Sequence, residues 1–473
     1  MRYVTRQSLC RRRILLGLLA VWLRCLGRAS PTGPAIIHAG NDAAGFAAVP
    51  HTVFAESAEE ALTQYARLQA GGRTLTAGSS RADTRVVVVN DIAGHFEVLA
   101  GVLFTLYRMR RGQQAAAASS IRLARPRVLF TGNPRGPTLN GLMDWLGQDV
   151  GNDAEWHALG SGPGGAAAAD APGDRGAGSA AGVDGAWRTP ADVVVCVSAE
   201  LAPKVCAAAV AGVQPQLLVV IVHRADTHTK NSKFLALHPQ ATRIMALAPH
   251  VANLSSHMLK RPVDWSMPVA PFVPAQPCLS KDCLQGFSIQ GALRRYKSKH
   301  GNGFTRDYGA LWARMLELRM QGMAVPPVVV VGKGERRHLM LPRELESSVT
   351  FHPWLKYQDF WMLIHRSYAL VPAFGMPVYY ESRISSTILA SLITCVPVIA
   401  EQRLLDTYTF LSEEHVFLRQ PDEDEAAAMA RIAALPEQAI FAKREALCEL
   451  RGQIDARVDR VLGGYLAEAS KAR

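Results

Sequence analysis

The chain has 473 residues, of which 49% are hydrophobic and 19% charged, and this balance excludes a disordered chain and an extended coiled coil. Its length predicts two or three domains of about 100–200 residues, each able to bury a core. Eight cysteines are too few for a disulfide scaffold, and none of their spacings is that of a zinc finger. The formal net charge of +12 would suit a nucleic-acid binder only if it were spread over a binding surface.

The basic excess is concentrated at the N-terminus. The first thirty residues contain seven arginines and no acidic residue, which leaves a net charge of only +5 for the other 443. Arginines at 11–13 precede the apolar run 14–23, and small residues follow at 27–30. This pattern predicts a signal peptide or a short signal anchor at 1–30, and hence the lumen of the endoplasmic reticulum or Golgi, or secretion, with membrane association only through the N-terminus. An Arg-rich organelle transit peptide is the alternative.

After an N-terminal extension at 31–84, apolar strands alternate with helices in a first domain at 85–267. Strands are predicted at 86–89, 127–130, 193–197 and 217–222, and the first is followed by a helix over 96–111. The strands lack polar alternation, as strands covered on both faces do. Such a chain predicts a doubly wound parallel α/β sheet, which binds its ligands at the carboxyl ends of the strands.

Two breaks interrupt this pattern. Residues 158–187 are rich in Ala, Gly, Pro and Asp with almost no large apolar residue, which predicts a low-complexity surface insertion. Residues 268–285 contain four prolines and predict a stiff linker between domains.

The strand–helix pattern then restarts in a second domain at 286–420, and C-terminal helices are predicted at 421–473. The predicted strands of this domain are 286–290, 327–331, 349–352, 369–372 and 396–400, and its helices are 308–321, 357–366 and 385–393. Two doubly wound domains joined by a linker are expected to enclose a cleft.

The segment 328–401 resembles the donor-binding domain of glycosyltransferases with the GT-B fold, especially the family-4-like group. The matching pieces are VVVVGKGE, VTFHPWLKYQDFWMLIHRSYALVPAF and ESRISSTILASLITCVPVIAE, and NDIAGHFEVLAGVL resembles the loop after the first strand of such enzymes. The resemblance implies two Rossmann-like domains and transfer of a sugar from a nucleotide-diphospho-sugar, with retention, to a glycan, lipid or protein. It also implies that the second domain binds the donor, that the first binds the acceptor, and that no metal or other cofactor is needed.

Several residues of the second domain have the chemistry of a diphosphate site. Gly332 and Gly334 allow a ligand to approach the backbone and Lys333 adds positive charge, although an ordinary strand–helix connection uses glycine too. A predicted helix begins at Ser385, Ser386 and Thr387. The hydroxyls of these residues, together with the N–H groups and dipole of the helix, are suited to binding phosphate. A plain N-cap is the alternative there.

Further candidates adjoin these. Arg383 precedes the helix start, and Gly291 and Arg306 follow the first strand of the domain, where the family has basic residues that stabilise the departing diphosphate. Arg306 also stands at a predicted helix start, so a surface role is the alternative.

Three residues are the catalytic candidates. His95 and His223 follow strands of the first domain, where a histidine can contact the sugar or transfer a proton, or simply fill a polar turn. Of the two glutamates that the family has in the second domain, the second aligns with Ala390 and the first with Ser382, next to Glu381. Glu381 is therefore the candidate near the donor sugar. The missing glutamate leaves a second hypothesis open, a catalytically inactive GT-B-like protein that binds glycans or nucleotides.

Two smaller features bear on the compartment. Cys278 and Cys283 are spaced for a small disulfide, with free thiols as the alternative, and Asn253-Leu254-Ser255 is an N-glycosylation sequon. The sequence contains no surface of interleaved aromatic and basic residues for nucleic acid, no phosphate-binding GxxxxGK loop and no HExxH motif. The valine-rich strands are not followed by GxGxxG.

Overall fold

The computed structural model describes residues 83–90, 94–115, 121–131, 140–159, 189–201, 203–227, 235–236, 238, 241–293, 295–298, 301–304 and 306–472. The predicted signal segment 1–30 and nearly all of the predicted extension and insertion lie outside these residues. Within them, no helix is both long and apolar enough to cross a membrane.

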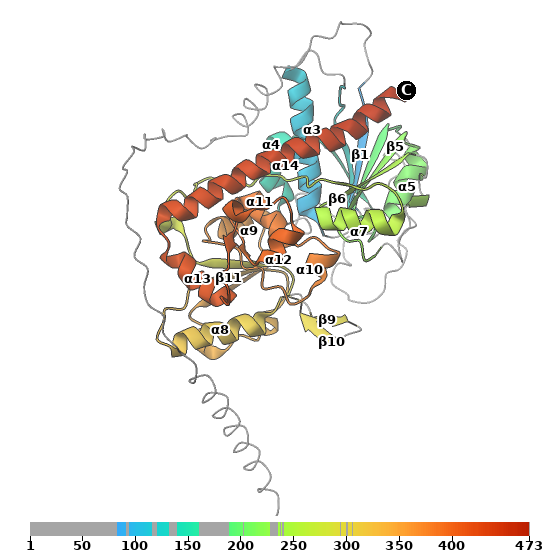
Figure 1. Cartoon of the computed structure of the whole chain (residues 1–473). Helices are drawn as coiled ribbons and strands as arrows, with labels where there is room; N and C mark the ends of the chain where they lie inside the picture. Colours follow the sequence, from blue (N-terminus) through green and yellow to red (C-terminus); the bar gives the residue numbers. More distant parts are fainter. Residues whose placement is uncertain are drawn as a thin grey trace, which may run out of the picture. The chain divides into compact units, whose positions relative to one another are not determined.

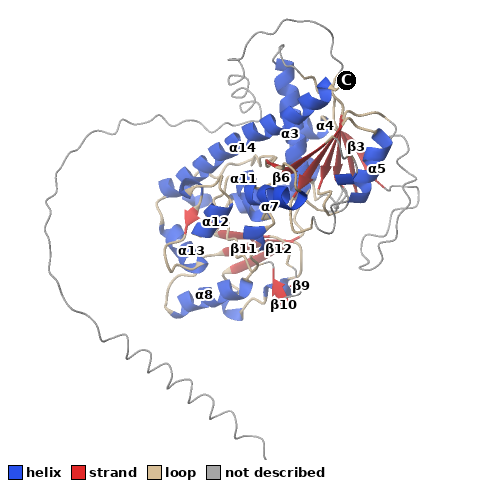
Figure 2. Cartoon of the chain, turned by 45° about the vertical axis from the view of Figure 1, so that its right-hand side comes forward, coloured by secondary structure: helices blue, strands red, loops and turns tan. Residues whose placement is uncertain are grey.

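The first sheet contains seven parallel strands, drawn in red in Figure 2. They are β1 (Val86–Asn90), β2 (Arg127–Thr131), β3 (Glu155–Leu159), β4 (Val193–Val197), β5 (Leu217–Val222), β6 (Thr242–Ala246) and β7 (Asp264–Trp265). Their order is β3-β2-β1-β4-β5-β6-β7, which is the Rossmann order with one added strand. Every residue of β1, β4 and β5 is buried, because helices cover both faces of the sheet.

Four helices connect these strands: α3 (Phe96–Ala115), α4 (Leu142–Asn152), α5 (Pro203–Val213) and α7 (Pro249–Leu259). All four predicted strands are confirmed, whereas β3, β6 and β7 were not predicted. The start of the predicted insertion is wrong, since Ala158 and Leu159 belong to β3. This edge strand pairs only with β2, and its short, partly polar sequence gives no clear strand pattern.

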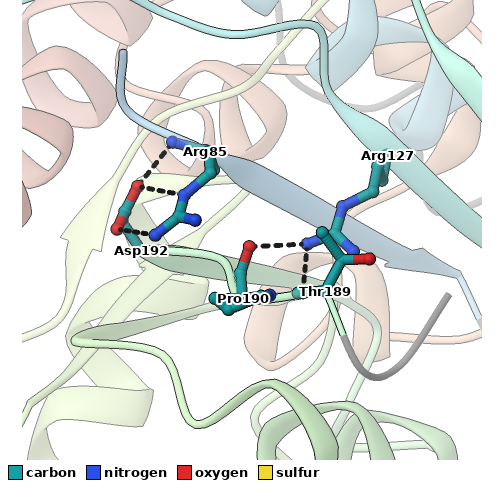
Figure 3. A network of polar contacts seen from close by, with 5 residues as sticks. All are labelled: Arg85, Arg127, Thr189, Pro190 and Asp192. Atoms are coloured by element: carbon teal, nitrogen blue, oxygen red, sulfur yellow. Dashed lines mark hydrogen bonds and ion pairs between the residues drawn. The ribbon is translucent and has the colours of Figure 1, made fainter. Parts of the chain in front are cut away.

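Polar contacts fix the amino ends of the central strands (Figure 3). The backbone N–H of Arg85 donates to Asp192 Oδ2 over 2.6 Å, and its guanidinium pairs with the same carboxylate. Arg127 donates to the carbonyls of Thr189 and Pro190 over 2.7 and 3.1 Å. Residues 189–192 are thereby held across the starts of β1 and β2, so that β4 enters the sheet in register.

The second sheet has the same order. β8 (Phe287–Gln290), β11 (Val328–Gly332) and β12 (Val349–Pro353) pair in parallel in the order β12-β11-β8. Leu370 then bridges Ser288 to Val398, and β13 (Ile399–Ala400) pairs with β14 (Phe417–Leu418). The predicted strand 369–372 is thus reduced to single bridges and the strand 396–400 to two residues, but the sheet still reads 3-2-1-4-5-6.

The helices of this half are α8 (Tyr308–Met320), α9 (Tyr357–His365), α10 (Val378–Glu381), α11 (Ser386–Thr394), α12 (Gln402–Thr407), α13 (Glu425–Ala434) and α14 (Glu437–Lys471). A hairpin of β9 (Arg295–Ser298) and β10 (Gly301–Phe304) precedes α8, and 3-10 turns occur at Lys281–Cys283, Arg336–Leu339, Arg343–Leu345 and Glu413–His415. The predicted helices of this half are confirmed within two residues at each end, apart from the C-terminal segment, which is divided between α13 and α14, whereas α3 of the first half extends four residues beyond its predicted end at 111.

The long helix α14 (red in Figure 1) returns from the second sheet and runs past α3 of the first. Arg108 on α3 forms ion pairs with Asp455 and Asp459 of α14, and Tyr465 donates to Asp264 of β7. One buried apolar cluster includes the first sheet, α11 and α14. The described residues accordingly belong to one compact unit, and the predicted domain boundaries stay predictions.

Six cysteines fall among the described residues, and all six are paired. The bonds are Cys196–Cys206, Cys278–Cys283 and Cys395–Cys448. The second is the predicted one. The third joins the C-cap of α11 to α14 and so fastens the returning helix to the second sheet.

Two parallel Rossmann-like sheets with connecting helices are the GT-B architecture. The chain has this fold, as the sequence resemblance implied.

Candidate functional site

A cavity of about 240 Å³ is lined by residues that follow the carboxyl ends of strands in both sheets. The first sheet contributes His95, Glu97, Val98, His223, Arg224 and Leu247, and the second contributes Gly291, Ala292, Arg306, Tyr379, Arg383, Ile384, Ser385, Ser386 and Leu389. Seven of the twelve residues predicted for the site meet here: His95, His223, Gly291, Arg306, Arg383, Ser385 and Ser386. Open α/β sheets bind ligands at such edges, so this cavity is the candidate site.

Four polar side chains cluster at the edge of the first sheet, where the strand order reverses between β1 and β4. His95 follows β1, Ser198 and Glu200 follow β4, and His223 follows β5 directly. His95 and Ser198 have φ angles of 55° and 65°. Backbone of this kind is uncommon outside glycine and often occurs at functional sites, where the surrounding structure holds it in place.

The hydroxyl of Ser198 joins the two imidazoles. Its Oγ lies 2.8 Å from Nδ1 of His95 and 3.1 Å from Nδ1 of His223, and the ring centroids are 3.9 Å apart. Oε1 of the fully buried Glu200 accepts the backbone N–H of His223 over 2.8 Å and lies 3.5 Å from its Nδ1. The Nε2 atom of His223 is buried and has no hydrogen-bond partner among the described residues.

Burial keeps both imidazoles neutral at physiological pH. It lowers the pKa of His223 to about 3, with nearby Arg224 acting in the same direction. The pKa of His95 is lowered well below its usual value, mainly by burial and further by His223. Burial raises the pKa of Glu200. Neutral imidazoles can accept a proton or donate a hydrogen bond, as acid–base chemistry requires.

Glu97 is a further acid–base group in the cavity. Burial raises its pKa, and its Oε2 accepts a hydrogen bond of 3.4 Å from Tyr357 at the start of α9. This contact links a helix of each sheet.

On the second-sheet side, Arg306 is a buried cation. Its guanidinium donates to the carbonyls of Pro372 and Gln290 and, over 2.6 Å, to Thr387 Oγ1. Only 3% of the residue is exposed, and none of these bonds goes to a carboxylate. The alternative of a surface role is therefore wrong. The carboxyl of Glu425 acts on this cation electrostatically but does not hydrogen-bond to it, so its N–H groups have only neutral partners among the described residues, which favours an anion in the adjoining cavity.

The three hydroxyls at the start of α11 have different surroundings. Ser385 is buried and caps the helix, since its Oγ accepts the N–H of Thr387 over 3.2 Å. Thr387 is buried against Arg306 and does not line the cavity. Ser386 is exposed, lines the cavity and accepts a hydrogen bond of 2.9 Å from Gln290. Ser386 is thus the hydroxyl best placed to reach a ligand.

The predicted glycines serve contacts within the chain. A Cβ at Gly332 would lie 1.8 Å from the carbonyl oxygen of Gly291, and one at Gly334 would lie 2.6 Å from Leu293 Cβ. Both have positive φ angles, which favours glycine there. Their contacts hold the loop after β8 against the end of β11 and thereby position Gly291 at the cavity.

Two charged candidates lie away from the cavity. Lys333 is stacked 5.9 Å from the ring centroid of Trp354 and does not line the cavity. Glu381 is exposed, faces Arg403 at 3.9 Å and does not line it either. The structure therefore does not bring Glu381 together with His95 and His223.

A second cavity of about 380 Å³ lies beyond the strand ends of the second sheet, among Phe374, Tyr380, Arg403 and Glu425. No residue of the first sheet lines it, so a reaction between two ligands held by different sheets belongs in the smaller cavity. Among the described residues, no group of His, Cys, Asp or Glu is arranged to hold a metal ion.

Sequence reasoning missed Ser198 and Glu200 as site residues. Ser198 and Glu200 follow the apolar strand VVVCV, just as His223 follows LLVVIV. The rule that singled out the histidines, namely polar residues at the carboxyl end of an apolar strand, would have found them.

No protein-family model matches the chain, and no curated protein is significantly similar to it in sequence. Solved structures share its fold at low identity. One is the lipopolysaccharide outer core galactosyltransferase WaaB (12% identity, 78% of this chain and 95% of that one, TM-score 0.38). Another is the α,α-trehalose 6-phosphate synthase of Burkholderia multivorans (12%, 83% and 100%, TM-score 0.44). A third is described as a UDP-N-acetylglucosamine 2-epimerase from Listeria monocytogenes (11%, 79% and 98%, TM-score 0.43). Similarity at this level carries no inference about activity.

Proposed function

We propose that this protein is a glycosyltransferase that moves a sugar from a nucleotide-diphospho-sugar to a hydroxyl group of a glycan, lipid or protein. The observation that carries the proposal is the composition of the smaller cavity. The first sheet supplies two neutral imidazoles, and the second supplies guanidinium groups and the N-terminus of α11. Proton transfer and diphosphate binding are thereby provided on the two sides of one cavity.

The second-sheet side has the requirements of a diphosphate site. Arg306 is a buried cation without a carboxylate partner among its hydrogen bonds, and Arg383 and Ser386 line the same cavity. The dipole of α11 adds a positive potential at its first turn. A leaving diphosphate would be stabilised by these groups as its charge develops.

The stereochemical outcome is not carried over from the sequence resemblance. The family's second glutamate is replaced by Ala390, which is buried within α11, and Glu381 lies outside the cavity.

Secretory targeting remains part of the proposal, with a lumenal body and possible membrane association through the N-terminus. The pairing of all six cysteines among the described residues supports it, because disulfides persist in oxidising compartments. An organelle transit peptide would deliver the chain to a compartment of different redox state.

Thermal-shift measurements on the full chain with UDP, GDP and their sugars test donor binding. A ligand at about 100 times its Kd stabilises a protein by about 2.7 kcal/mol, which is an easily measured shift. Transfer of radiolabelled sugar from the stabilising donor to a panel of glycans and lipids then tests the enzyme. Binding without transfer to any acceptor or to water would favour the inactive nucleotide-binding protein. No binding would reject the enzyme and leave the inactive glycan-binding protein.

The Arg306→Met variant provides the specificity control for this screen. It should lose the nucleotide response, whereas Arg314→Met, which removes exposed ion pairs with Glu317 and Asp424, should keep it.

A further inference from the structure

The four polar residues at the edge of the first sheet form a connected chain: Glu200, His223, Ser198 and His95. A hydroxyl has a single proton, so Ser198 can donate to only one of the two Nδ1 atoms. The position of Glu200 determines which one.

Glu200 favours a proton on Nδ1 of His223. That nitrogen lies 3.5 Å from Oε1 of Glu200 and 3.1 Å from the Ser198 hydroxyl, so that both of its neighbours are oxygen acceptors. Neutral imidazole has one N–H and one lone pair. With the proton on Nδ1, the lone pair of His223 is on Nε2. This buried atom has no hydrogen-bond partner among the described residues, and His223 itself lines the cavity.

Through its hydrogen bonds, Ser198 favours the opposite tautomer in His95. The Ser198 oxygen accepts the hydrogen bond from His223 Nδ1–H. The Ser198 hydroxyl then donates its proton to Nδ1 of His95, which lies 2.8 Å away. His95 must consequently have its proton on Nε2. The two rings, whose centroids are 3.9 Å apart, are thus a base and a hydrogen-bond donor.

We propose that Glu200 and Ser198 are positioning residues that hold His223 and His95 in opposite tautomers, so that His223 Nε2 is the base for the acceptor hydroxyl and the reaction inverts the anomeric centre. This inference rests on the proposed glycosyl transfer. His95 Nε2–H donates a hydrogen bond to a substrate oxygen. Glu97 is the other carboxyl at the cavity, but its Oε2 is engaged by Tyr357.

The reaction balances as one displacement. The acceptor oxygen forms a bond to the anomeric carbon, and its proton passes to His223 Nε2. The bond from that carbon to the diphosphate oxygen breaks, and its electron pair leaves on the diphosphate beside Arg306 and Arg383. The proposal places the acceptor on the first-sheet side of the sugar and the leaving diphosphate on the second-sheet side, so that attack and departure occur on opposite faces. Glu200 stabilises the imidazolium formed at His223.

The first test needs no donor. Two-dimensional ¹⁵N NMR of the full chain with labelled histidine distinguishes Nδ1–H from Nε2–H imidazole, and His95→Gln and His223→Gln assign the signals. At pH 7 we expect Nδ1–H for His223 and Nε2–H for His95. Ser198→Ala should leave His95 without its fixed tautomer, while the same exchange at Ser256, on α7, should not affect it. The same tautomer on both rings, the reverse assignment, or a protonated imidazole at pH 7 would overturn the proposal.

The second test uses the donor identified by the screen. His223→Gln should lower kcat about 10²- to 10⁴-fold, the usual range for loss of a general base. Glu200→Gln and Ser198→Ala should lower kcat at least tenfold with the donor KM within twofold, and His257→Gln, on the exposed side of α7, is the control. A kcat that falls in Glu97→Gln but not in His223→Gln would contradict the assignment.

The product provides a third readout. An α-linked donor should give a β-glycoside, seen in the anomeric coupling constant by ¹H NMR, and a retained configuration would reject inversion. If no nucleotide sugar is a donor, glycosyl transfer fails on its own, while the tautomers measured by NMR still decide whether Glu200 and Ser198 set the two histidines.

Discussion

Arg383 and Asp226 form a bidentate ion pair across the edge of the cavity. Nε of Arg383 lies 3.1 Å from each carboxylate oxygen, and its Nη2 lies 2.5 Å from Oδ2. Backbone hydrogen bonds from Ala225 to Ser382 and from Ile384 to His223 flank the pair. The contact joins the loop after β5 to the loop before α11. It also neutralises a guanidinium that the sequence assigns to the diphosphate.

If Arg383 exchanges Asp226 for the diphosphate on donor binding, the two partners have opposite effects on affinity. Asp226→Asn should tighten UDP several-fold, because a competing carboxylate is removed. Arg383→Gln should weaken it by about tenfold or more, since a charge-assisted hydrogen bond contributes about 1.5–3 kcal/mol. Isothermal titration calorimetry measures both. Equal weakening in both variants would mean that the pair only holds the two loops together.

Arg306→Met should affect stability and binding together. The substitution removes the guanidinium N–H groups that donate to Thr387 Oγ1 and to two buried carbonyls. We expect this loss to lower the free energy of unfolding by about 1–3 kcal/mol. UDP affinity should fall more than tenfold. Urea unfolding and UDP titration check these values against Arg314→Met, whose exposed ion pairs with Glu317 and Asp424 should contribute little to either quantity. Wild-type affinity in Arg306→Met would remove the anion site.

The histidine pair predicts a dependence on pH. Because the pKa of His223 falls to about 3 on folding, only the unfolded chain takes up this proton between pH 3 and about 6.5, and stability decreases as the pH falls through that window. From pH 7 to 5.5 the loss is on the order of 1 kcal/mol for this residue. His223→Gln should remove that part of the difference in urea unfolding, and the same exchange at exposed His257 controls for the substitution.

The pH dependence of activity should also reflect the protonation of His223. The charged or titratable side chains around His223 are His95, Glu97, Glu200, Arg224, Arg306 and Arg383. With its pKa lowered by burial, His223 remains a base in mildly acidic solution, so the acidic limb of kcat/KM should lie below pH 6. A limb centred near pH 6.5 would identify an ordinary, solvated histidine instead.

The disulfides should differ in their contributions to stability. Cys395–Cys448 spans 53 residues and Cys278–Cys283 spans five. Loop-closure entropy then predicts a loss of about 4 kcal/mol for the paired Cys→Ala exchange at the first and about 2 kcal/mol at the second. Urea unfolding of the two double variants measures the order. A larger loss at Cys278–Cys283 would show that chain entropy does not dominate.

Asn253 offers a test of the secretory route. It is exposed on α7 and begins the sequon Asn253-Leu254-Ser255. Expression through the endoplasmic reticulum should add one glycan, seen as a mass shift that peptide N-glycosidase reverses and that Asn253→Gln abolishes. Import of the chain into another organelle without glycan addition would favour the transit peptide.

The strands that the sequence predicted are those whose pattern is local. β1, β4, β5 and β11 are runs of valine and leucine, which must be buried on both faces wherever they fold. The formation of β3 depends on its pairing with β2, and β7 is held by a contact with α14. Leu370 pairs only through single bridges. Their pairing partners are distant in sequence, so local pattern gave them no signal.

The candidate site shows the same division. Polar residues at strand ends identified His95 and His223, and a helix start identified Ser385 and Ser386. Sequence could not show that Ser385 is used as a cap, that Lys333 and Glu381 lie outside the cavity, or that Arg306 is buried. Each of these facts depends on which distant backbone comes within hydrogen-bond reach.

By itself, the sequence determined that most of the net charge of +12 lies in residues 1–30, and that the rest alternates strands and helices in two α/β halves. Local hydrophobic period and residue type suffice for that. Only the tertiary structure decided the chemistry: Ser198 lies between two histidines 103 and 25 residues away, and Asp226 neutralises Arg383 from 157 residues away. Protonation state and ion pairing are set by burial and by neighbours in space, which the strand order brings together.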